Sequence, residues 1–454
     1  MASKTTVLII AVLLISIFLI FVYLTPRETP TTAPQPTKEV TTPQPTTSVV
    51  SRCPDEIVIG TPMPISGRYA AEAQYTLWGA MAVVNWFNDR GGLDCGGKKV
   101  KIRLIYRDSE SKLELAQSLT ETLVTRDRVH FLLSPYGSDL AIGVSPIAEK
   151  YGVLMAVVGA ASDRIFQQGF EYVVGVAAVA SQYMAPVLDM VKATDPNARR
   201  VAILYRDSEF NRMVAEGAKK YAEKLGFEVV AYEVYPATPK DLTPQILKIK
   251  AANPDVIIVA SHFADGQLAV RQLAEQKVEA KLLALSVAPL VPEFYDTLKN
   301  LAECVTGPSH WEVDVEYTPQ LAKSRGVEWF GPTKEEFIQY FKRAAREMSG
   351  KEVEPGYHAA WGAMGVLTIL YGVYKSGDVD SRNVLEALKK ARFMTFFSEF
   401  RLDPANNINV AHSMVVTQWQ GGERVTIWPR DVAHSQLKYP SLTWDEKSAG
   451  RLCR

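Results

Sequence analysis

The chain has 454 residues, of which 47% are hydrophobic and 10% aromatic, which is enough apolar material for one or two large buried cores. Its 50 lysine and arginine residues balance its 50 aspartate and glutamate residues, so the formal net charge is zero. With no charge excess and no basic stripe carrying interleaved aromatic residues, the composition argues against a nucleic-acid-binding protein.

An uncharged apolar run, Val7 to Leu24, comes first in the chain. Its length of about 18 residues is close to the minimum for a helix that spans a bilayer. The alternative is a cleaved signal peptide, whose apolar region is shorter, about 7–15 residues, and ends at small residues. This run ends in Phe21-Val22-Tyr23-Leu24. We therefore expect residues 1–24 to be an uncleaved single-pass membrane anchor, with the rest of the chain outside the cytoplasm.

Residues 25–52 are rich in threonine and proline. A segment of this composition cannot bury a core and is typical of an extended, semi-rigid spacer. We expect it to be a disordered linker that holds the following part of the chain away from the membrane.

From Glu56 onward, short apolar runs alternate with amphipathic runs. An alternation of strand and helix predicts a parallel sheet covered by helices on both faces. The expected strands are residues 57–60, 100–106, 131–133 and 154–158, and the expected helices are residues 75–88, 113–125 and 140–150.

The same alternation then restarts, which predicts a second lobe like the first. Its expected helices are residues 184–193, 212–225, 242–251 and 267–276, and its expected strands are residues 201–205, 228–234, 256–260 and 282–285. Two long helices follow at residues 333–348 and 358–375, and a hairpin is expected around Gly421-Gly422. The fold class is thus α/β, with two doubly wound parallel-sheet lobes.

Two such sheets that face each other place the carboxyl ends of their strands around one cleft, where open α/β sheets bind ligands. The sequence has no Gly-x-Gly-x-x-Gly after the first strand and no phosphate loop, which disfavours a nucleotide-dependent enzyme. It also has no Gly-x-Ser-x-Gly, Cys-x-x-Cys or His-x-x-x-His motif. We therefore expect a binding protein without a cofactor or a metal, rather than an enzyme.

Several short motifs follow one another between Asp55 and Pro429. In chain order they are Ile57-Val58-Ile59-Gly60, Pro64-Ile65-Ser66-Gly67, Gly79-Ala80, Gly91-Gly92, Arg107-Asp108-Ser109, Ser134-Pro135-Tyr136-Gly137-Ser138, Pro146-Ile147-Ala148, Ala202-Ile203-Leu204-Tyr205, Asn253-Pro254-Asp255 and Tyr357-His358-Ala359-Ala360. In this order and spacing the chain resembles the branched-chain amino acid (Leu/Ile/Val-type) substrate-binding proteins of ABC importers, which have the type 1 periplasmic binding protein fold.

The resemblance implies a chain that crosses between its lobes three times. Lobe one is expected to contain residues 55–175 and 314–392, and lobe two residues 176–313 and 393–430, with residues 431–454 as a C-terminal tail. The implied function is that of an extracytoplasmic, monomeric component of an ABC importer, which captures a small polar ligand (an amino acid, amide or carboxylate) by hinge closure and delivers it to permease and ATPase subunits. The alternative is a ligand-sensing ectodomain of the same fold, although Met1 to Thr6 is short for a signalling output on the other side of the membrane.

In lobe one, the resemblance implies ligand contacts from small hydroxyl residues and backbone amides at helix N-termini, which favour an anion. Ser138 is the first such residue, and an N-terminal helix cap is its alternative role. Ser162 and Ala160 occupy the corresponding position after the fourth strand, with the alignment uncertain by one residue.

In lobe two, the resemblance implies that Phe210, His262 and Phe263 face the ligand. The alternatives are an aromatic side chain packed on the lobe for Phe210 and an ordinary surface histidine for His262. Tyr183, near a crossover, is interpreted as core or hinge packing rather than as a ligand contact.

Two positions depart from the family pattern. Ser286 replaces a glutamate that holds the ligand ammonium group in the amino acid binders, and Glu72 replaces an aromatic residue that covers the ligand. A buried ammonium group without a carboxylate is costly. Either Glu72 or Asp265 therefore takes over the pairing, or the ligand is not an α-amino acid. A solvated residue in the first turn of a helix is the alternative for Glu72.

The four cysteines are expected to form disulfides, because an even count in an exported chain is typical of them. Cys53 and Cys95 precede the first two strands, which are neighbours in the fold that the resemblance implies, so we expect them to pair. Cys304 and Cys453 remain and can pin the C-terminal tail.

Overall fold

The computed structural model describes residues 53–454. The predicted anchor at Val7–Leu24 and the predicted linker at residues 25–52 lie outside the described residues. Within residues 53–454, no helix combines the length and the apolar character that crossing a membrane requires.

The first lobe is built on an eight-stranded sheet with the order β15-β16-β6-β5-β4-β1-β3-β2. Its centre is parallel, with β1 between β3 and β4, as expected from the alternating sequence pattern. Its strands are β1 (Glu56–Thr61), β2 (Leu93–Cys95), β3 (Lys98–Tyr106), β4 (Phe131–Leu133), β5 (Met155–Val157), β6 (Val173–Gly175), β15 (Leu402–Asp403) and β16 (Ile408–Asn409). Its helices are α2 (Ala70–Asp89), α3 (Leu113–Thr125), α4 (Ser138–Tyr151), α5 (Asp163–Phe166), α12 (Lys334–Ser349), α13 (Tyr357–Ser376) and α14 (Ser381–Lys389).

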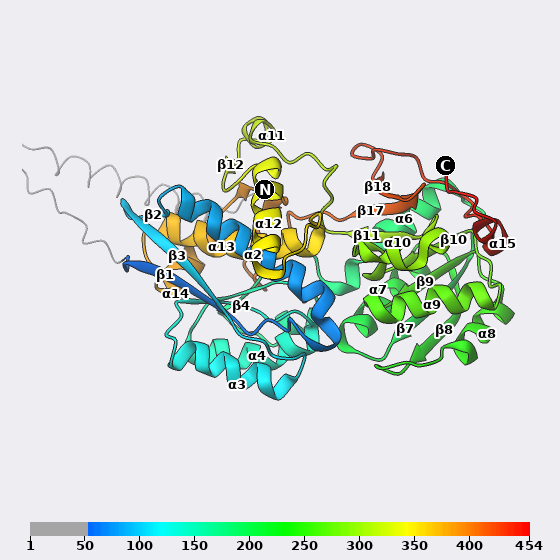
Figure 1. The fold of residues 1–454 in the computed structure, drawn as a ribbon, viewed down its shortest axis with the longest axis horizontal. Helices are drawn as coiled ribbons and strands as arrows, with labels where there is room; N and C mark the ends of the chain where they lie inside the picture. The colour runs from blue at the N-terminus through cyan, green and yellow to red at the C-terminus, as the bar shows by residue number, and fades with distance from the viewer. Residues whose placement is uncertain (1–52) are drawn as a thin grey trace, which may run out of the picture. The chain divides into compact units, whose positions relative to one another are not determined.

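Helices α2 and α13 pack backbone against backbone, and α12 lies beside α2 (Figure 1). A Cβ atom on Gly79 would lie 1.8 Å from the carbonyl oxygen of Ala359, and one on Gly362 would lie 1.9 Å from that of Thr76. Only glycine fits at both positions, because the two helix backbones approach too closely for a side chain. This contact fixes α13, whose first turns carry residues of the candidate site.

The second lobe is built on a seven-stranded sheet with the order β18-β17-β11-β10-β9-β7-β8. Strands β7 to β11 are parallel, and β17 and β18 form the expected antiparallel hairpin. Gly421 and Gly422 in its turn have φ angles of 61° and 87°, which glycine adopts without strain. The strands are β7 (Arg200–Arg206), β8 (Glu228–Tyr235), β9 (Val256–Ala260), β10 (Leu282–Leu285), β11 (Thr306–Ser309), β17 (Val415–Gln420) and β18 (Glu423–Trp428). The helices are α6 (Ala185–Thr194), α7 (Glu209–Lys224), α8 (Thr243–Ala252), α9 (Phe263–Glu275), α10 (Glu293–Leu298) and α15 (Trp444–Ser448).

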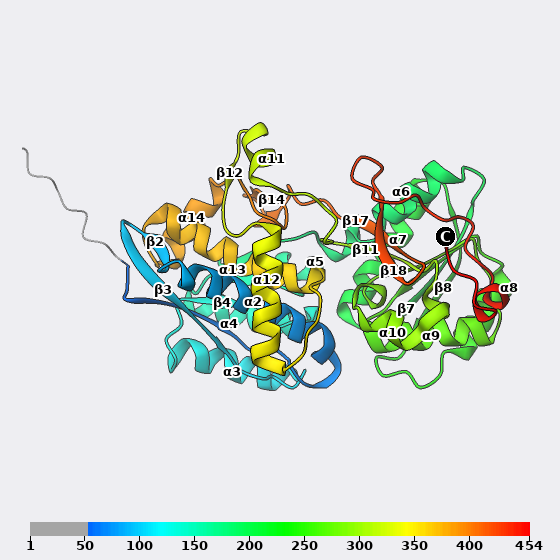
Figure 2. The same cartoon turned by 45° about the horizontal axis from the view of Figure 1, so that its top comes forward.

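The chain passes to the second sheet after β6, returns after β11 and crosses a third time after β16, and the two sheets are separated in the view of Figure 2. A small sheet of β12 (Glu328–Trp329), β13 (Phe393–Met394) and β14 (Glu399–Phe400) and the helix α11 (Pro319–Ser324) lie along the returning segment. The predicted boundary at Phe393 is wrong by about 17 residues. Phe393 stacks on Tyr371 of α13, with ring centroids 3.8 Å apart, and β16 pairs with β6. Residues 393–409 therefore belong to lobe one, because their aromatic side chains fill its core.

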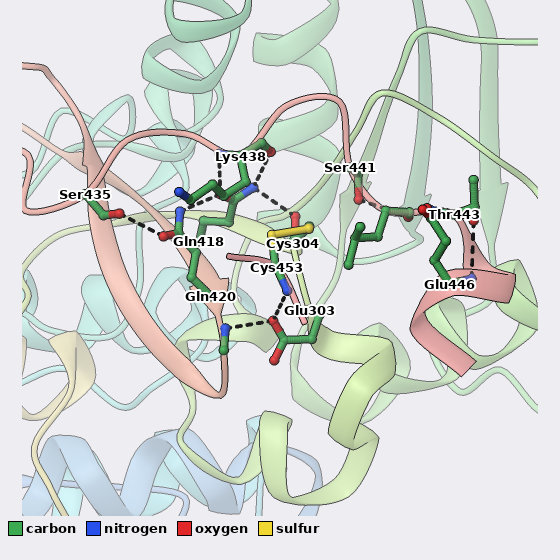
Figure 3. Close-up of a disulfide and its surroundings, with 12 residues drawn as sticks. Glu303, Cys304, Gln418, Gln420, Ser435, Lys438, Ser441, Thr443, Glu446 and Cys453 are labelled. Carbon is green, nitrogen blue, oxygen red and sulfur yellow. Dashed lines mark hydrogen bonds between the residues drawn. A yellow bond between two sulfur atoms is a disulfide. The ribbon is translucent and has the colours of Figure 1, made fainter. Parts of the chain in front are cut away.

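The C-terminal tail, residues 431–454, packs on lobe two. The indole nitrogen of Trp444 donates to the carbonyl oxygen of Val278 at 2.7 Å. Cys453 is bonded to Cys304, a pairing that the sequence left open, with Cα atoms 5.4 Å apart. Figure 3 shows Glu303 beside this disulfide, where its carboxylate accepts the backbone N–H of Cys453 at 3.0 Å.

The predicted disulfide between Cys53 and Cys95 is confirmed, with Cα atoms 6.0 Å apart. Cys95 ends the short strand β2, which pairs antiparallel with β3, while Cys53 precedes β1, the parallel neighbour of β3. The hairpin thus brings both cysteines to the same end of the sheet.

Candidate ligand-binding site

Residues from both lobes enclose a small cavity where the strands of the two sheets end. Its volume is about 10 Å³, about the space of one water molecule, so the lobes are closed over it. The cavity is lined by Tyr136, Gly137, Ser138, Gly159, Ala161, Tyr183, Phe210, His262, Val287, Tyr357 and Trp361. Three residues predicted to contact ligand, Ser138, Phe210 and His262, are among these.

A larger hollow of about 750 Å³ lies in lobe two, between α6, β18 and the C-terminal tail. All of its lining residues come from that one lobe. Movement of the lobes would not enclose a ligand there, so the cavity between the lobes is the better candidate site.

Ser138 begins α4, after the helix cap Gly137. Its hydroxyl oxygen accepts the backbone N–H groups of Ala161 at 3.1 Å and Ser162 at 3.0 Å. Its side chain therefore joins two loops of lobe one and does not cap its own helix. Because its oxygen accepts both amides, the proton of the Ser138 hydroxyl remains to donate to an anionic group beside the N-terminus of α4.

The other two predicted lobe-one residues lie beside the cavity. Ala160 belongs to a core cluster of lobe one, and it is Ala161, one position further on, that lines the cavity. The hydroxyl of Ser162 accepts the backbone N–H of Arg164 at 3.2 Å, as the cap of α5, and donates to Glu209 of lobe two at 2.9 Å. Ser162 thus holds Ser138 through its backbone amide and makes a side-chain contact between the lobes.

In lobe two, Phe210 and His262 lie side by side at the cavity, with ring centroids 5.4 Å apart. His262 is only 3% exposed, so the alternative of an ordinary surface histidine is wrong. Burial, and then the positive charge of Arg206, lower its pKa well below the usual range. Its Nδ1 atom has no hydrogen-bond partner among residues 53–454. A neutral ring with one unused nitrogen is thus available to a ligand.

Phe263 and Ser286 have structural contacts next to the site rather than a place on its wall. The backbone N–H of Phe263 donates to a carboxylate oxygen of Glu72 at 3.2 Å. The hydroxyl of Ser286 donates to the carbonyl oxygen of Ser261 at 2.9 Å and accepts its N–H at 3.0 Å. Ser286 therefore ties the ends of β9 and β10 together, at the position where amino acid binders are expected to have a glutamate.

Glu72 is only 1% exposed, so its alternative as a solvated helix residue is wrong. Burial raises the pKa of this carboxyl group to about 7, against the stabilising hydrogen bond from Phe263 and the nearby charge of Arg206. Glu72 belongs to lobe one and Phe263 to lobe two, so their hydrogen bond joins the lobes. Like the hydrogen bond from Ser162 to Glu209, a further contact between the lobes runs from the hydroxyl of Tyr75 to Glu293, at 3.1 Å.

Asp265, the other proposed partner for a ligand ammonium group, is already paired. It forms a buried ion pair with Arg206 at 3.1 Å and accepts the hydroxyl of Tyr235 at 2.6 Å. Neither Glu72 nor Asp265 lines the cavity, and no acidic side chain in the described part of the chain does. An ammonium group in this cavity would therefore have no carboxylate beside it.

Sequence reasoning missed most of the aromatic wall. Tyr136, Tyr357 and Trp361 line the cavity together with Tyr183, for which the sequence indicates core or hinge packing. Tyr357 and Trp361 are four residues apart in α13, so they share one face of the helix. This spacing, and the place of Tyr136 two residues before Ser138, were the available signals.

Comparison with known proteins identifies relatives over nearly the whole described chain. Residues 56–423 match a family model described as periplasmic binding protein. A Leu/Ile/Val-binding protein homolog 7 from Brucella suis is 24% identical over 396 residues, covering 85% of this chain and 94% of that protein. A Leu/Ile/Val-binding protein homolog 8 from Brucella abortus is 21% identical over 406 residues, covering 85% and 93%.

Solved structures show the same fold. The solute-binding protein of an ABC transporter from Rhodopseudomonas palustris, in complex with p-hydroxybenzoic acid, superposes with a TM-score of 0.69 at 18% identity, covering 86% of this chain and 99% of that one. A branched-chain amino acid transporter substrate-binding protein from Streptococcus pneumoniae, in complex with isoleucine, gives 0.67 at 21% identity, covering 82% and 100%. The predicted two-lobed α/β fold is thereby confirmed.

Proposed function

The chain belongs to the periplasmic binding protein family, and from that premise we propose that it captures a small carboxylate for an ABC importer by closing its two lobes. It is a solute-binding protein of the ABC transporter type rather than an enzyme. The ligand class and the closing motion are the proposed parts.

The observation that carries the proposal is the chemistry of the cavity wall. The hydroxyl oxygen of Ser138 accepts the amides of Ala161 and Ser162, so its proton points away from them and can donate to a carboxylate next to the N-terminus of α4. The rest of the wall is mostly aromatic, and no acidic side chain from residues 53–454 lines the cavity. This favours a carboxylate with an apolar or aromatic body over a zwitterionic α-amino acid, whose ammonium group would be buried without a partner. Both kinds of ligand occur among the structural relatives, since one was crystallised with p-hydroxybenzoic acid and another with isoleucine.

We further propose that the protein is a monomer held at the outer face of a membrane by Val7–Leu24, where it delivers ligand to permease and ATPase subunits. The disulfides Cys53–Cys95 and Cys304–Cys453 support an oxidising location outside the cytoplasm. The ligand contacts of Ser138, Phe210 and His262 belong to the same proposal.

Matched ligand pairs test the function. A ligand that binds only the folded state stabilises it by about 2.7 kcal/mol at 100 times its dissociation constant, which raises the melting temperature. We expect 3-phenylpropanoate and 4-methylpentanoate to raise the melting temperature more than phenylalanine and leucine, which add only an α-ammonium group to the same skeletons. Benzoate and 4-hydroxybenzoate extend the series to aromatic acids.

Two outcomes contradict the proposal in different ways. If the amino acids stabilise the protein more than their deaminated partners, the ligand class is wrong while the binding role stands. If no carboxylate or amino acid in the series shifts the melting temperature, the proposed capture of a small carboxylate is wrong.

A further inference from the structure

Each of the segments that cross between the lobes contributes one polar ring to a short hydrogen-bonded chain. Tyr183 lies in the first crossover, His310 directly follows β11 in the second, and His412 lies between β16 and β17 in the third. The hydroxyl oxygen of Tyr183 is 2.7 Å from Nε2 of His310, and Nδ1 of His310 is 2.9 Å from Nε2 of His412. The chain thus joins residues that are 127 and 102 positions apart in the sequence.

The hydrogen-bonded chain of these three side chains is buried. Tyr183, His310 and His412 are 1%, 2% and 9% exposed. Burial lowers the pKa of His310 well below its usual range, helped by the neighbouring His412 and His358, and burial lowers the pKa of His412 to about 3. Both rings are therefore neutral at pH 7, and each has one N–H donor and one acceptor nitrogen. His310 can donate to one neighbour and accept from the other, so both hydrogen bonds form at once.

One end of the chain is at the cavity and the other is behind it. Tyr183 lines the cavity, and the ring of His310 lies 4.5 Å from that of Trp361, another lining residue. His412 does not line the cavity. Its ring stacks on Phe397, with centroids 4.8 Å apart and planes 9° apart. His412 is therefore connected to the cavity wall through His310, which contacts the lining residues Tyr183 and Trp361.

We propose, resting on the proposed function, that Tyr183, His310 and His412 form the hinge element of this receptor, which keeps the three crossovers joined while the lobes move. Hinge closure concentrates backbone changes in a few residues at the ends of elements. Crossovers that are held to one another turn about one point, so lobe two meets lobe one in one orientation. Tyr183 is then held at the cavity wall, and His310 and His412 are positioning residues for it.

Substitution at His412 tests the proposal without any ligand. His412→Phe keeps a flat ring against Phe397 but removes the hydrogen bond to His310, whereas His412→Gln keeps an amide N–H that can donate to it. Spin labels on cysteines introduced at Ser118 of α3 and Lys220 of α7, both exposed, report the distance between the lobes by pulsed electron paramagnetic resonance in the full-length protein. We expect a broader distance distribution for His412→Phe than for the parent, and the parental width for His412→Gln.

His130→Phe is the matched control. His130 is a half-buried histidine just before β4, at the end of this inner strand away from the cavity, and its Nδ1 accepts the N–H of Val58 at 3.0 Å. Its substitution should leave the distance distribution unchanged. Urea denaturation of each variant measures any general loss of stability. Such a loss by itself leaves the distance distribution unchanged, whereas a change at the hinge broadens it.

A distribution for His412→Phe that is no broader than that of the parent overturns the proposal, whatever the variant's stability. If His412→Phe does not fold, Tyr183→Phe, which removes only the hydroxyl, takes its place with the same two outcomes. Since no ligand is involved, failure of the carboxylate series would refute the proposed function and leave the hinge result standing.

Discussion

Replacement of Glu72 by glutamine should make the protein more stable at neutral pH and leave its stability near pH 4.5 almost unchanged. Glu72 is 1% exposed, and one of its carboxylate oxygens accepts the backbone N–H of Phe263 from the other lobe at 3.2 Å. Glutamine keeps an oxygen that can accept this hydrogen bond and removes the ionisable group. The substitution therefore isolates the cost of a buried negative charge.

The magnitude follows from the pKa of Glu72, which burial raises from 4.5 to about 7. Below pH 4.5 the carboxyl group is protonated in the folded and in the unfolded chain, so it costs nothing. Between pH 4.5 and 7 the unfolded chain ionises first, and the folded state loses about 1.4 kcal/mol per pH unit relative to it. The loss reaches about 3 kcal/mol near pH 7 and is constant above it. The glutamine variant escapes this loss.

Urea denaturation at pH 5, 6, 7 and 8 measures the free energy of unfolding of both proteins. We expect the difference between them to grow with pH and to level off above pH 7. Glu114→Gln is the matched control, because Glu114 is also a first-turn glutamate, in α3, but is exposed. A difference between Glu72→Gln and the parent that does not change from pH 5 to 8 would refute the reasoning.

Other expectations follow from single contacts. Ser138→Ala should weaken carboxylate binding by about 1–3 kcal/mol in calorimetry, because the ligand loses the hydroxyl donor and the two loops that the hydroxyl joins are no longer held together, and unchanged affinity would remove Ser138 from the site. Trp361→Ala should weaken the binding of an aromatic carboxylate. This loss should exceed the loss that Ser138→Ala causes for a small aliphatic carboxylate, and equal losses in calorimetry would count against an aromatic wall. Gly362→Ala should lower the thermal midpoint by several degrees, since its Cβ would lie 1.9 Å from a carbonyl oxygen of α2, and a variant with the parental midpoint would show that α2 and α13 can separate. Replacement of the Cys304–Cys453 pair by serines, which frees a loop of 149 residues, should cost about 2–5 kcal/mol of unfolding free energy in urea, and a smaller cost would mean that Trp444 alone anchors the tail.

Local patterns in the sequence predicted most of the elements. The bounds expected for the helix at residues 113–125 and for the strands at residues 131–133, 256–260 and 282–285 agree with the structure. Each of these elements has its own hydrophobic periodicity and is bounded by polar segments. Both signals reflect the burial of one short stretch of chain, so they are local properties. The resemblance to the family placed Ser138, Phe210 and His262 at the ligand, and all three line the cavity at the edge where parallel strands end.

Only the tertiary structure decided which side chains share an environment. Glu72 is a first-turn residue of a helix, a position usually solvated, and it is buried because the N-terminus of α9 lies over it, 191 residues further along the chain. Residues 393–409 fill the core of lobe one, although the predicted boundary assigned them to lobe two. Three crossovers far apart in sequence meet at His310. The sequence by itself determined the helices and strands and the edge of the sheets at which a ligand binds, since these follow from the period of short segments. The composition of the cavity and the meeting of the crossovers were decided by long-range packing, because that alone fixes how the two lobes face each other.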